Sequence, residues 1–255
     1  LLDFMIGCII QARLGSTRLP GKIMMNLDGE NSVLDYVVNQ LKFCKYLDKI
    51  IIATTTLKQD NSLVKYSKNN ELDYFCGDEN DVLDRFYQCA RHFSFSIIVR
   101  VTSDCPLIDP NIVDTVIDKL VKGNFDYTTN KLPLINSKCP HGTEVEVFSF
   151  KTLEKTWLES KKISEREHVT PYIYDNPKKF RIFNLDYEKD FSHMRYTIDR
   201  PKDLELVQKI VKKIKTRPIL TENIVKLFTT EPELPLINSE YKRNEGYFKS
   251  ILDEK

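Results

Sequence analysis

Short runs rich in β-branched residues alternate with longer amphipathic stretches, and this alternation leaves few folds open to the chain. The runs expected to form strands are residues 6–10, 49–54, 73–76 and 97–101. Between them, apolar residues recur at helical spacing in 32–44, 61–69 and 80–92. Asp109 followed by Pro110 predicts the capped start of a further helix, reaching about residue 122. Strands that alternate with helices indicate an α/β fold with a mostly parallel sheet.

The alternation becomes less regular after about residue 123. Strands are expected at 126–129, 143–148, 180–185 and 195–198, and helices at 151–160 and from Pro201 to about residue 214. A length of 255 residues fits one large domain. We therefore expect a single domain over 5–230 that carries an inserted lobe at about 124–190. The C-terminal tail, 231–255, is expected to pack on this domain.

Composition excludes several classes of function. The chain has 38 Lys and Arg against 37 Asp and Glu, a formal net charge of +1, so nothing steers it as a whole toward nucleic acid or an anionic membrane. Its six cysteines show no zinc or redox spacing. No apolar run is long enough to span a membrane, and no leader precedes Met5. We expect a cytoplasmic protein without membrane insertion that binds anions only locally.

The segment QARLGSTRLPGK, residues 11–22, follows the first expected strand. Its glycines, Gly15 and Gly21, allow close approach of a ligand to the backbone, and its cations, Arg13, Arg18 and Lys22, suit polyphosphate oxygens. The spacing is neither that of a Walker loop nor that of a dinucleotide fingerprint. A basic surface turn is the simpler alternative. The position at the carboxyl end of a strand in an α/β sheet favours a phosphate site.

Two carboxylates are expected near this loop. Asp104 and Asp199 each come directly after an expected strand, and each is followed by a proline two residues later. Asp104 alone could be a simple turn residue. Two such carboxylates beside a polycationic loop predict a site for Mg²⁺ carried by a nucleoside triphosphate. Asp109 and Asp203 are better explained as helix caps.

Six motifs occur in an order that resembles one enzyme family: QARLGSTRLPGK (11–22), GDENDVLDRF (77–86), RVTSDCPLIDP (100–110), HGTEVEVFS (141–149), EREHVTPYI (165–173) and YTIDRPKDLELV (196–207). The family is that of the CTP-dependent sugar cytidylyltransferases, in the branch of the spore-coat polysaccharide enzymes. It is more distantly similar to the CMP-Kdo and CMP-sialic acid synthetases. The resemblance spans nearly the whole chain, including the NEGY segment near its end.

The resemblance implies a Rossmann-like nucleotide-diphospho-sugar transferase fold of the GT-A-like type. It also implies a reaction in which an acceptor hydroxyl attacks the α-phosphate of CTP and pyrophosphate leaves. The implied catalytic residues are Arg13, Lys22, Asp104 and Asp199, with Mg²⁺ at the two carboxylates. The implied nucleotide-binding residues also include Gln11, Ala12, Gly15, Ser16, Thr17, Arg18, Asp78, Arg85 and Ser103. Glu144, Glu146 and His168 would bind the acceptor.

Several of these residues have an alternative explanation in the sequence. Asp81 and Arg85 could form an i,i+4 pair on a helix surface. Glu144 and Glu146 fall on one side of an expected strand, where they are either solvated or hold a cation. Glu167 and His168 are expected to open a helix.

The base and the acceptor are not fixed by the sequence. Another nucleoside triphosphate, a non-sugar acceptor and a glycosyltransferase that uses a nucleotide-sugar stay open as alternatives. No acidic pair close together after a suitable strand supports the last of these. The partners expected are CTP, a small-molecule acceptor and a second copy of the chain, in a homodimer built from 124–190.

Overall fold

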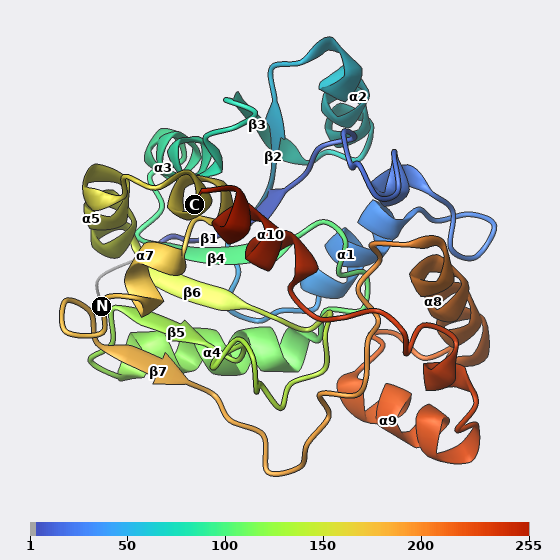
Figure 1. Cartoon of the computed structure of the whole chain (residues 1–255). Coiled ribbons are helices and arrows are strands. Elements are labelled where there is room, and N and C mark those ends of the chain that lie inside the picture. Colours follow the sequence, from blue (N-terminus) through green and yellow to red (C-terminus); the bar gives the residue numbers. More distant parts are fainter. Residues whose placement is uncertain (1–3, 255) are drawn as a thin grey trace.

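The computed structural model describes residues 4–254 and contains one seven-stranded sheet with helices on both faces (Figure 1). The strand order is β3-β2-β1-β4-β6-β5-β7. The strands are β1 (Ile6–Gln11), β2 (Lys49–Thr55), β3 (Asp73–Gly77), β4 (Ile97–Thr102), β5 (Tyr127–Thr129), β6 (Glu146–Ser149) and β7 (Ile182–Asn184). Neighbouring strands run parallel, except that β6 is antiparallel to both β4 and β5. The predicted mixed, mostly parallel α/β sheet is confirmed.

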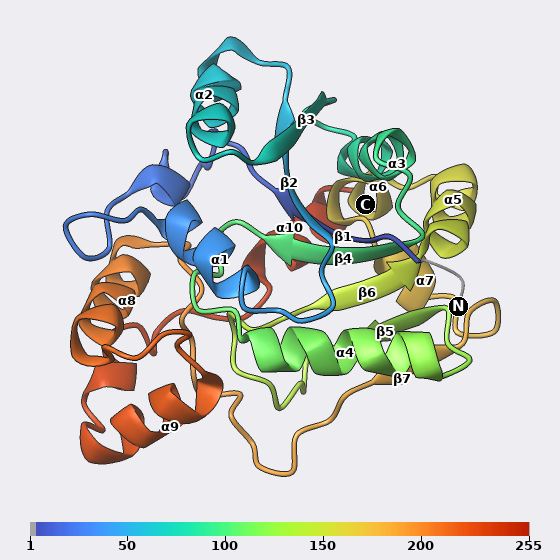
Figure 2. The ribbon, with the colours of Figure 1, turned by 180° about the vertical axis from the view of Figure 1, so that it is seen from behind.

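Successive side chains of each strand point to opposite faces of the sheet. Each face is covered by its own set of helices (Figure 2). On one face Ile10 and Val99 pack with α1 (Val33–Leu41), α2 (Asn61–Asn69) and α4 (Pro110–Lys122). On the other face Ile9 and Ile98 pack with α3 (Val82–His92), α5 (Phe150–Glu159) and α7 (Pro171–Tyr174). α6 (Ile163–His168) lies between α5 and α7 in the chain. Burial of both sheet faces explains why the central strands are mostly apolar.

A third apolar cluster lies beside the sheet and is built on the C-terminal helices. α8 (Pro201–Lys213) and α9 (Thr221–Thr230) enclose Tyr196 and Ile198 there. The last helix, α10 (Glu245–Asp253), lies outside this cluster and crosses in front of β4 (Figure 1). Between residues 4 and 254, none of the helices is both long and apolar enough to cross a membrane.

The prediction of a strand at 195–198 is wrong. Only an isolated bridge joins Arg195 to His141. The amides of Tyr196 and Thr197 both donate to the carbonyl of His141, whereas that of Ile198 donates to the carbonyl of Asp104. The segment is extended, but its hydrogen bonds converge on two carbonyls and do not follow one neighbouring strand.

The segment 124–190, predicted to form an inserted lobe, supplies β5, β6 and β7 to the main sheet. β6 begins at Glu146, later than predicted, because the Val145 amide donates to the Asn130 side chain at 2.9 Å. Dimerisation through this segment stays a prediction.

Candidate active site

The site lies where the chain turns outward on both sides of β1. β1 pairs with β2 on one side and with β4 on the other, so the loops that follow β1 and β4 diverge at the carboxyl ends of these two strands. In open α/β sheets ligands bind at this kind of crevice. The loop after β1 is anchored to the turn that follows β2, because the Leu14 amide donates to buried Asp60 at 2.8 Å. Gly21 closes the loop with φ of 68°, a left-handed conformation that favours glycine.

Lys22 connects the two predicted carboxylates. Its Nζ lies 2.7 Å from Asp104 Oδ2 and 2.8 Å from Asp199 Oδ1, although the residues are far apart in the chain. Burial would lower the pKa of Lys22, but Asp104 and Asp199 outweigh burial, so this pKa is raised. The structure therefore brings together the loop cation and both strand-end carboxylates.

Asp199 is surrounded by cations. Arg18 Nη2 lies 2.5 Å from Oδ1, and Arg195 Nη2 lies 3.2 Å from Oδ2. Burial would raise the pKa of Asp199, but Lys22 and Arg18 hold it well below its usual range. Arg195 is itself fixed by Asp203, which is fully buried and also accepts the amides of Asp199 and Arg200. Asp203 thus caps α8, as predicted, and positions Arg195.

The donor set suits a Mg²⁺ ion shared with a substrate. Asp104 and Asp199 provide hard carboxylate oxygens on facing segments, with side chains 23% and 15% exposed. Within residues 4–254 no group of three or more His, Cys, Asp or Glu side chains converges to hold a metal. Mg²⁺ commonly takes one or two protein carboxylates and completes its shell with water and phosphate oxygens. The two aspartates therefore fit such an ion, and they do not fit a closed metal cage.

A cationic pocket extends from Asp104 along the loop after β1. It is lined by predicted nucleotide-binding residues from three segments: Gln11, Ala12, Arg13, Ser16, Thr17, Arg18, Lys22, Arg85, Ser103 and Asp104. Two of the predicted nucleotide-binding residues, Gly15 and Asp78, do not line this cavity. The Asp78 carboxylate instead accepts the amides of Asn80 and Asp81 in an exposed turn. We call this cavity the phosphate pocket.

Arg85 is the deepest cation of the phosphate pocket. The predicted alternative of an Asp81–Arg85 surface pair is wrong, because Asp81 caps α3 and pairs with Arg166. Arg85 is only 2% exposed, and no carboxylate among the described residues lies within ion-pair distance. One guanidinium nitrogen donates to the Asp78 carbonyl at 2.6 Å, and Nε has no partner among the described residues. Burial and nearby Arg13 lower the pKa of Arg85 to about 10.

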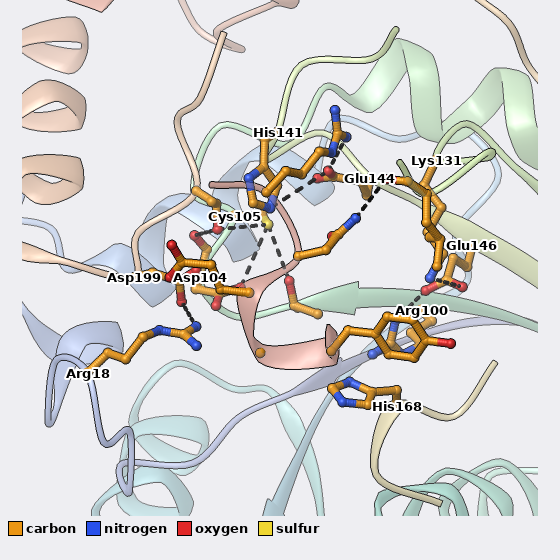
Figure 3. Close-up of a pocket in the computed structure, with 18 of the residues that line it drawn as sticks. Arg18, Arg100, Asp104, Cys105, Lys131, His141, Glu144, Glu146, His168 and Asp199 are labelled. Carbon is orange, nitrogen blue, oxygen red and sulfur yellow. Dashed lines mark hydrogen bonds and ion pairs between the residues drawn. The ribbon is translucent and has the colours of Figure 1, made fainter. Parts of the chain in front are cut away.

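A second pocket adjoins the first at Asp104 and Arg18 (Figure 3). Glu146 lies in it and is almost fully buried. Lys131 Nζ approaches Glu146 at 2.8 Å, and Arg100 also pairs with Glu146. Burial would raise the pKa of Glu146, but Lys131 and Arg100 lower it to about 2. We call this cavity the acceptor pocket.

Glu144 also lines the acceptor pocket. Arg243 Nη2 lies 2.5 Å from its Oε1, and the Gly142 amide donates to Oε2 at 2.7 Å. The sequence left Glu144 and Glu146 either solvated or holding a cation. The structure shows that both carboxylates hold cations, which are side chains of the same chain.

His168 lines both pockets and ends a helix, so the prediction that it opens one is wrong. Its Nε2 lies 2.9 Å from the hydroxyl of Ser250, and its ring meets Tyr247 edge-on with centroids 5.1 Å apart. Burial, Arg100 and Lys131 lower the pKa of His168 to about 4, so the ring is neutral near pH 7. His168 holds α10 against the site.

Several site residues were not predicted from the sequence: Arg100, Lys131, His141, Arg195 and Arg243. One signal was present, since Arg100 is a cation inside an apolar strand, IIVRVT. The others lie in irregular segments that tertiary packing brings to the pocket.

A polycationic loop at a sheet crevice, two facing carboxylates and an adjoining polar pocket define a nucleotide-dependent transferase. Comparison with known proteins gives the family. The profile described as Cytidylyltransferase matches residues 7–228. The chain therefore belongs to the cytidylyltransferase family, whose members transfer CMP from CTP to an acceptor and release pyrophosphate.

Three relatives illustrate the extent of this likeness. The chain is 38% identical over 237 residues to the uncharacterized protein MJ1063 of Methanocaldococcus jannaschii, covering 92% of this chain and 95% of that protein. It is 31% identical over 233 residues to the spore coat polysaccharide biosynthesis protein SpsF of Bacillus subtilis, covering 88% and 94%. A cytidylyltransferase structure from Leptospira borgpetersenii superposes with a TM-score of 0.87 at 31% identity, covering 94% of this chain and 100% of that one.

Proposed function

We propose that this cytidylyltransferase transfers CMP from CTP to a hydroxyl of an acidic sugar in polysaccharide biosynthesis, with Mg²⁺ bound at Asp104 and Asp199. The observation that carries the proposal is Lys22, whose ammonium connects both carboxylates at the junction of two pockets. SpsF, named for spore coat polysaccharide biosynthesis, supports the biosynthetic context. The six free thiols of the described chain support a reducing, cytoplasmic setting.

In this proposal the phosphate pocket positions CTP. Arg13, Arg18 and Lys22 neutralise the triphosphate, and buried Arg85 gives a fixed positive charge at the pocket floor. In-line displacement at phosphorus depends mainly on positioning and charge neutralisation. Mg²⁺, when bound, would polarise the α-phosphate and lower the pKa of the attacking hydroxyl. The loop cations would stabilise the departing pyrophosphate.

The acceptor pocket favours an anionic acceptor. Away from Asp104 and Asp199, three cations (Arg100, Lys131 and Arg243) face two carboxylates (Glu144 and Glu146). The remaining carboxylate of the lining, Glu245, is paired with Arg200 outside the pocket, so one positive charge remains. Burial lowers the pKa values of His141 and His168, so neither ring adds charge near pH 7. A carboxylate on the acceptor would balance the remaining charge. The acid sugars of the CMP-Kdo and CMP-sialic acid synthetases carry such a group.

Pyrophosphate release is the direct test. The protein is assayed with each of ATP, CTP, GTP and UTP, first with Mg²⁺ and then with EDTA, against 3-deoxy-manno-octulosonate, N-acetylneuraminate and a neutral hexose. We expect release with CTP, Mg²⁺ and an acidic acceptor only. Equal rates with all four nucleotides would contradict use of CTP, and turnover in EDTA would contradict the metal. A preference for the neutral hexose would contradict the acidic acceptor.

A further inference from the structure

The C-terminal segment, residues 242–254, lies at the junction of the two pockets. Arg243, Asn244 and Tyr247 line the acceptor pocket, Lys249 lines the phosphate pocket, and Gly246 lines both. Figure 1 shows α10 crossing the front of the sheet at β4, away from α9. The predicted tail therefore packs on the domain at its active site, where it forms a wall that both pockets share.

Polar bonds, most of them to residues that line the pockets, hold this wall in place. Asn244 Nδ2 donates to the Leu134 carbonyl at 2.9 Å, and Arg200 Nη2 lies 2.8 Å from Glu245 Oε2. Arg243 pairs with Glu144, and Ser250 bonds to His168. No α10 side chain that the structure describes is fully buried, and Leu252 is 67% exposed. Apolar burial therefore contributes little, and polar contacts fix the segment, several of them with residues that line the pockets.

Gly246 gives independent support for a role in the site. It is the second residue of α10, within the first turn of the helix. Its φ is not positive, so the backbone conformation does not require glycine. A Cβ at Gly246 would lie 3.2 Å from Nη1 of Arg18, the cation that pairs with Asp199. A side chain at this position would require Arg18 to shift by a few tenths of an ångström, so the wall lies directly against the cation that pairs with Asp199.

We propose that the segment from Arg243 to Tyr247 recognises the acceptor and determines which acceptor is used, an inference that rests on the proposed function. The Tyr247 ring is held edge-on by His168 and lines the acceptor pocket together with Tyr174. A ring fixed in this way offers an apolar surface to the C–H face of a sugar. Asn244 adds an amide at the same wall. The ligand class is therefore a hydroxylated ring that carries an acid group.

The test compares Tyr247→Ala and Tyr247→Phe with Leu252→Ala, a matched control on the exposed side of the same helix. The probe is whichever of 3-deoxy-manno-octulosonate and N-acetylneuraminate supports faster pyrophosphate release by the wild type. Acceptor KM is measured at saturating CTP, and CTP Kd is measured by calorimetry. We expect Tyr247→Ala to raise acceptor KM about tenfold or more, with CTP Kd changed less than about twofold. Tyr247→Phe should retain most acceptor affinity, and the control should match the wild type.

Two results would overturn the inference alone. One is a wild-type enzyme that turns over while Tyr247→Ala keeps its acceptor KM within about twofold. The other is a Tyr247→Ala variant that weakens CTP and acceptor equally, as a general disturbance of the site would. A wild-type protein that releases no pyrophosphate from CTP with either acid would refute the proposed acidic acceptor, and the acceptor wall with it.

Discussion

At the scale of single residues, Lys22 shows how several charged side chains are accommodated together in a partly buried site. Lys22, Arg18 and Arg195 face Asp104, Asp199 and Asp203, so the cluster is balanced without a ligand. Balanced and hydrogen-bonded charges avoid most of the cost of burial. A triphosphate and its metal ion would replace some of these ion pairs with their own contacts. The cluster of charged side chains itself is already formed. The site is thus organised electrostatically before substrates bind.

Asp104→Asn should keep the fold and remove metal-dependent turnover. The amide has the same shape as the carboxylate but lacks the charge that a Mg²⁺ ligand provides, so we expect a loss of more than about 10³ in rate. Asp118→Asn is the control, because Asp118 pairs with exposed Lys122 on α4 outside both pockets. Initial rates over a Mg²⁺ titration decide the matter. Near wild-type turnover in Asp104→Asn would remove Asp104 from the catalytic group.

Arg85→Met should stabilise the fold while it weakens CTP binding. Folding lowers the pKa of Arg85 to about 10, so Arg85 stays charged at pH 7 but its charge costs stability in the native state. A methionine of similar length would remove a buried charge without leaving a carboxylate unpaired. We expect a higher midpoint of thermal unfolding and a CTP Kd raised about tenfold or more. Arg13→Met is the matched control, since Arg13 is 42% exposed and its loss should weaken CTP without stabilising the fold.

His168 should make stability depend on pH. Its folded pKa, about 4, lies below the ordinary 6.5, so the unfolded chain binds more protons between these values and stability falls as pH is lowered through this range. Arg100, Lys131, Glu146 and Glu254 face the ring, and Glu167 Oε2 lies 3.8 Å from it.

Replacing the ring with an amide isolates this effect. His168→Gln does not titrate and keeps an N–H for Ser250, so its free energy of unfolding should fall less than that of the wild type on going from pH 7 to pH 5. We expect the two to differ by roughly 2 kcal/mol in this change. Urea unfolding at both pH values measures it. Parallel pH profiles would contradict a depressed pKa for His168.

At the scale of helices and strands, local signals predicted the regular elements well. α2 and α4 have the predicted bounds, and Asp109 and Pro110 begin α4 as expected. The errors fall where tertiary contacts replace local ones. The segment 195–198 extends toward the carbonyls of His141 and Asp104, and His168 ends a helix.

The same distinction applies to the candidate site. The loop after β1 and the two aspartates could be located from the sequence because strand ends mark them. Lys131 and Arg243 could not, since their partners Glu146 and Glu144 become neighbours only after folding, and for Arg243 the partner is 99 residues away. The local sequence of an irregular segment carries no signal of which distant carboxylate it will meet.

Asp109→Ala should show that this cap links two helices. One carboxylate oxygen accepts the Asn111 amide of α4 at 2.9 Å, and the other accepts the Thr221 amide of α9 at 2.7 Å. Loss of a cap costs about 1 kcal/mol, and leaving the second buried donor unpaired adds about 1–3 kcal/mol. We expect a loss of roughly 2–4 kcal/mol in urea unfolding, with normal turnover of the folded fraction. A loss under about 1 kcal/mol would show that Thr221 finds another acceptor.

At the scale of the whole molecule, the sheet places the chemistry and the irregular segments complete it. β1 and β4 present the phosphate pocket at one crevice, whereas the acceptor pocket is lined by side chains of β4 and β6 together with residues from 131–144, α6, α7, the segment before α8 and the C-terminal wall. In the proposed function the nucleotide would meet mainly the ends of adjacent strands. Under the same proposal the acceptor would also meet irregular segments, which can vary without disturbing the sheet, so differences in acceptor use are expected there.

The last prediction is a homodimer formed through the segment 124–190. β7 ends the strand order, so no described strand pairs with its outer edge, and exposed edges are commonly paired or covered. Ile135, in the loop of the same segment, is 77% exposed. Light scattering at micromolar concentration should give twice the chain mass of 29.9 kDa. Ile135→Asp should weaken the dimer, whereas Leu236→Asp, an equally apolar and 67% exposed position outside the segment, should not. A fully active species at 29.9 kDa would show that the enzyme works as a monomer.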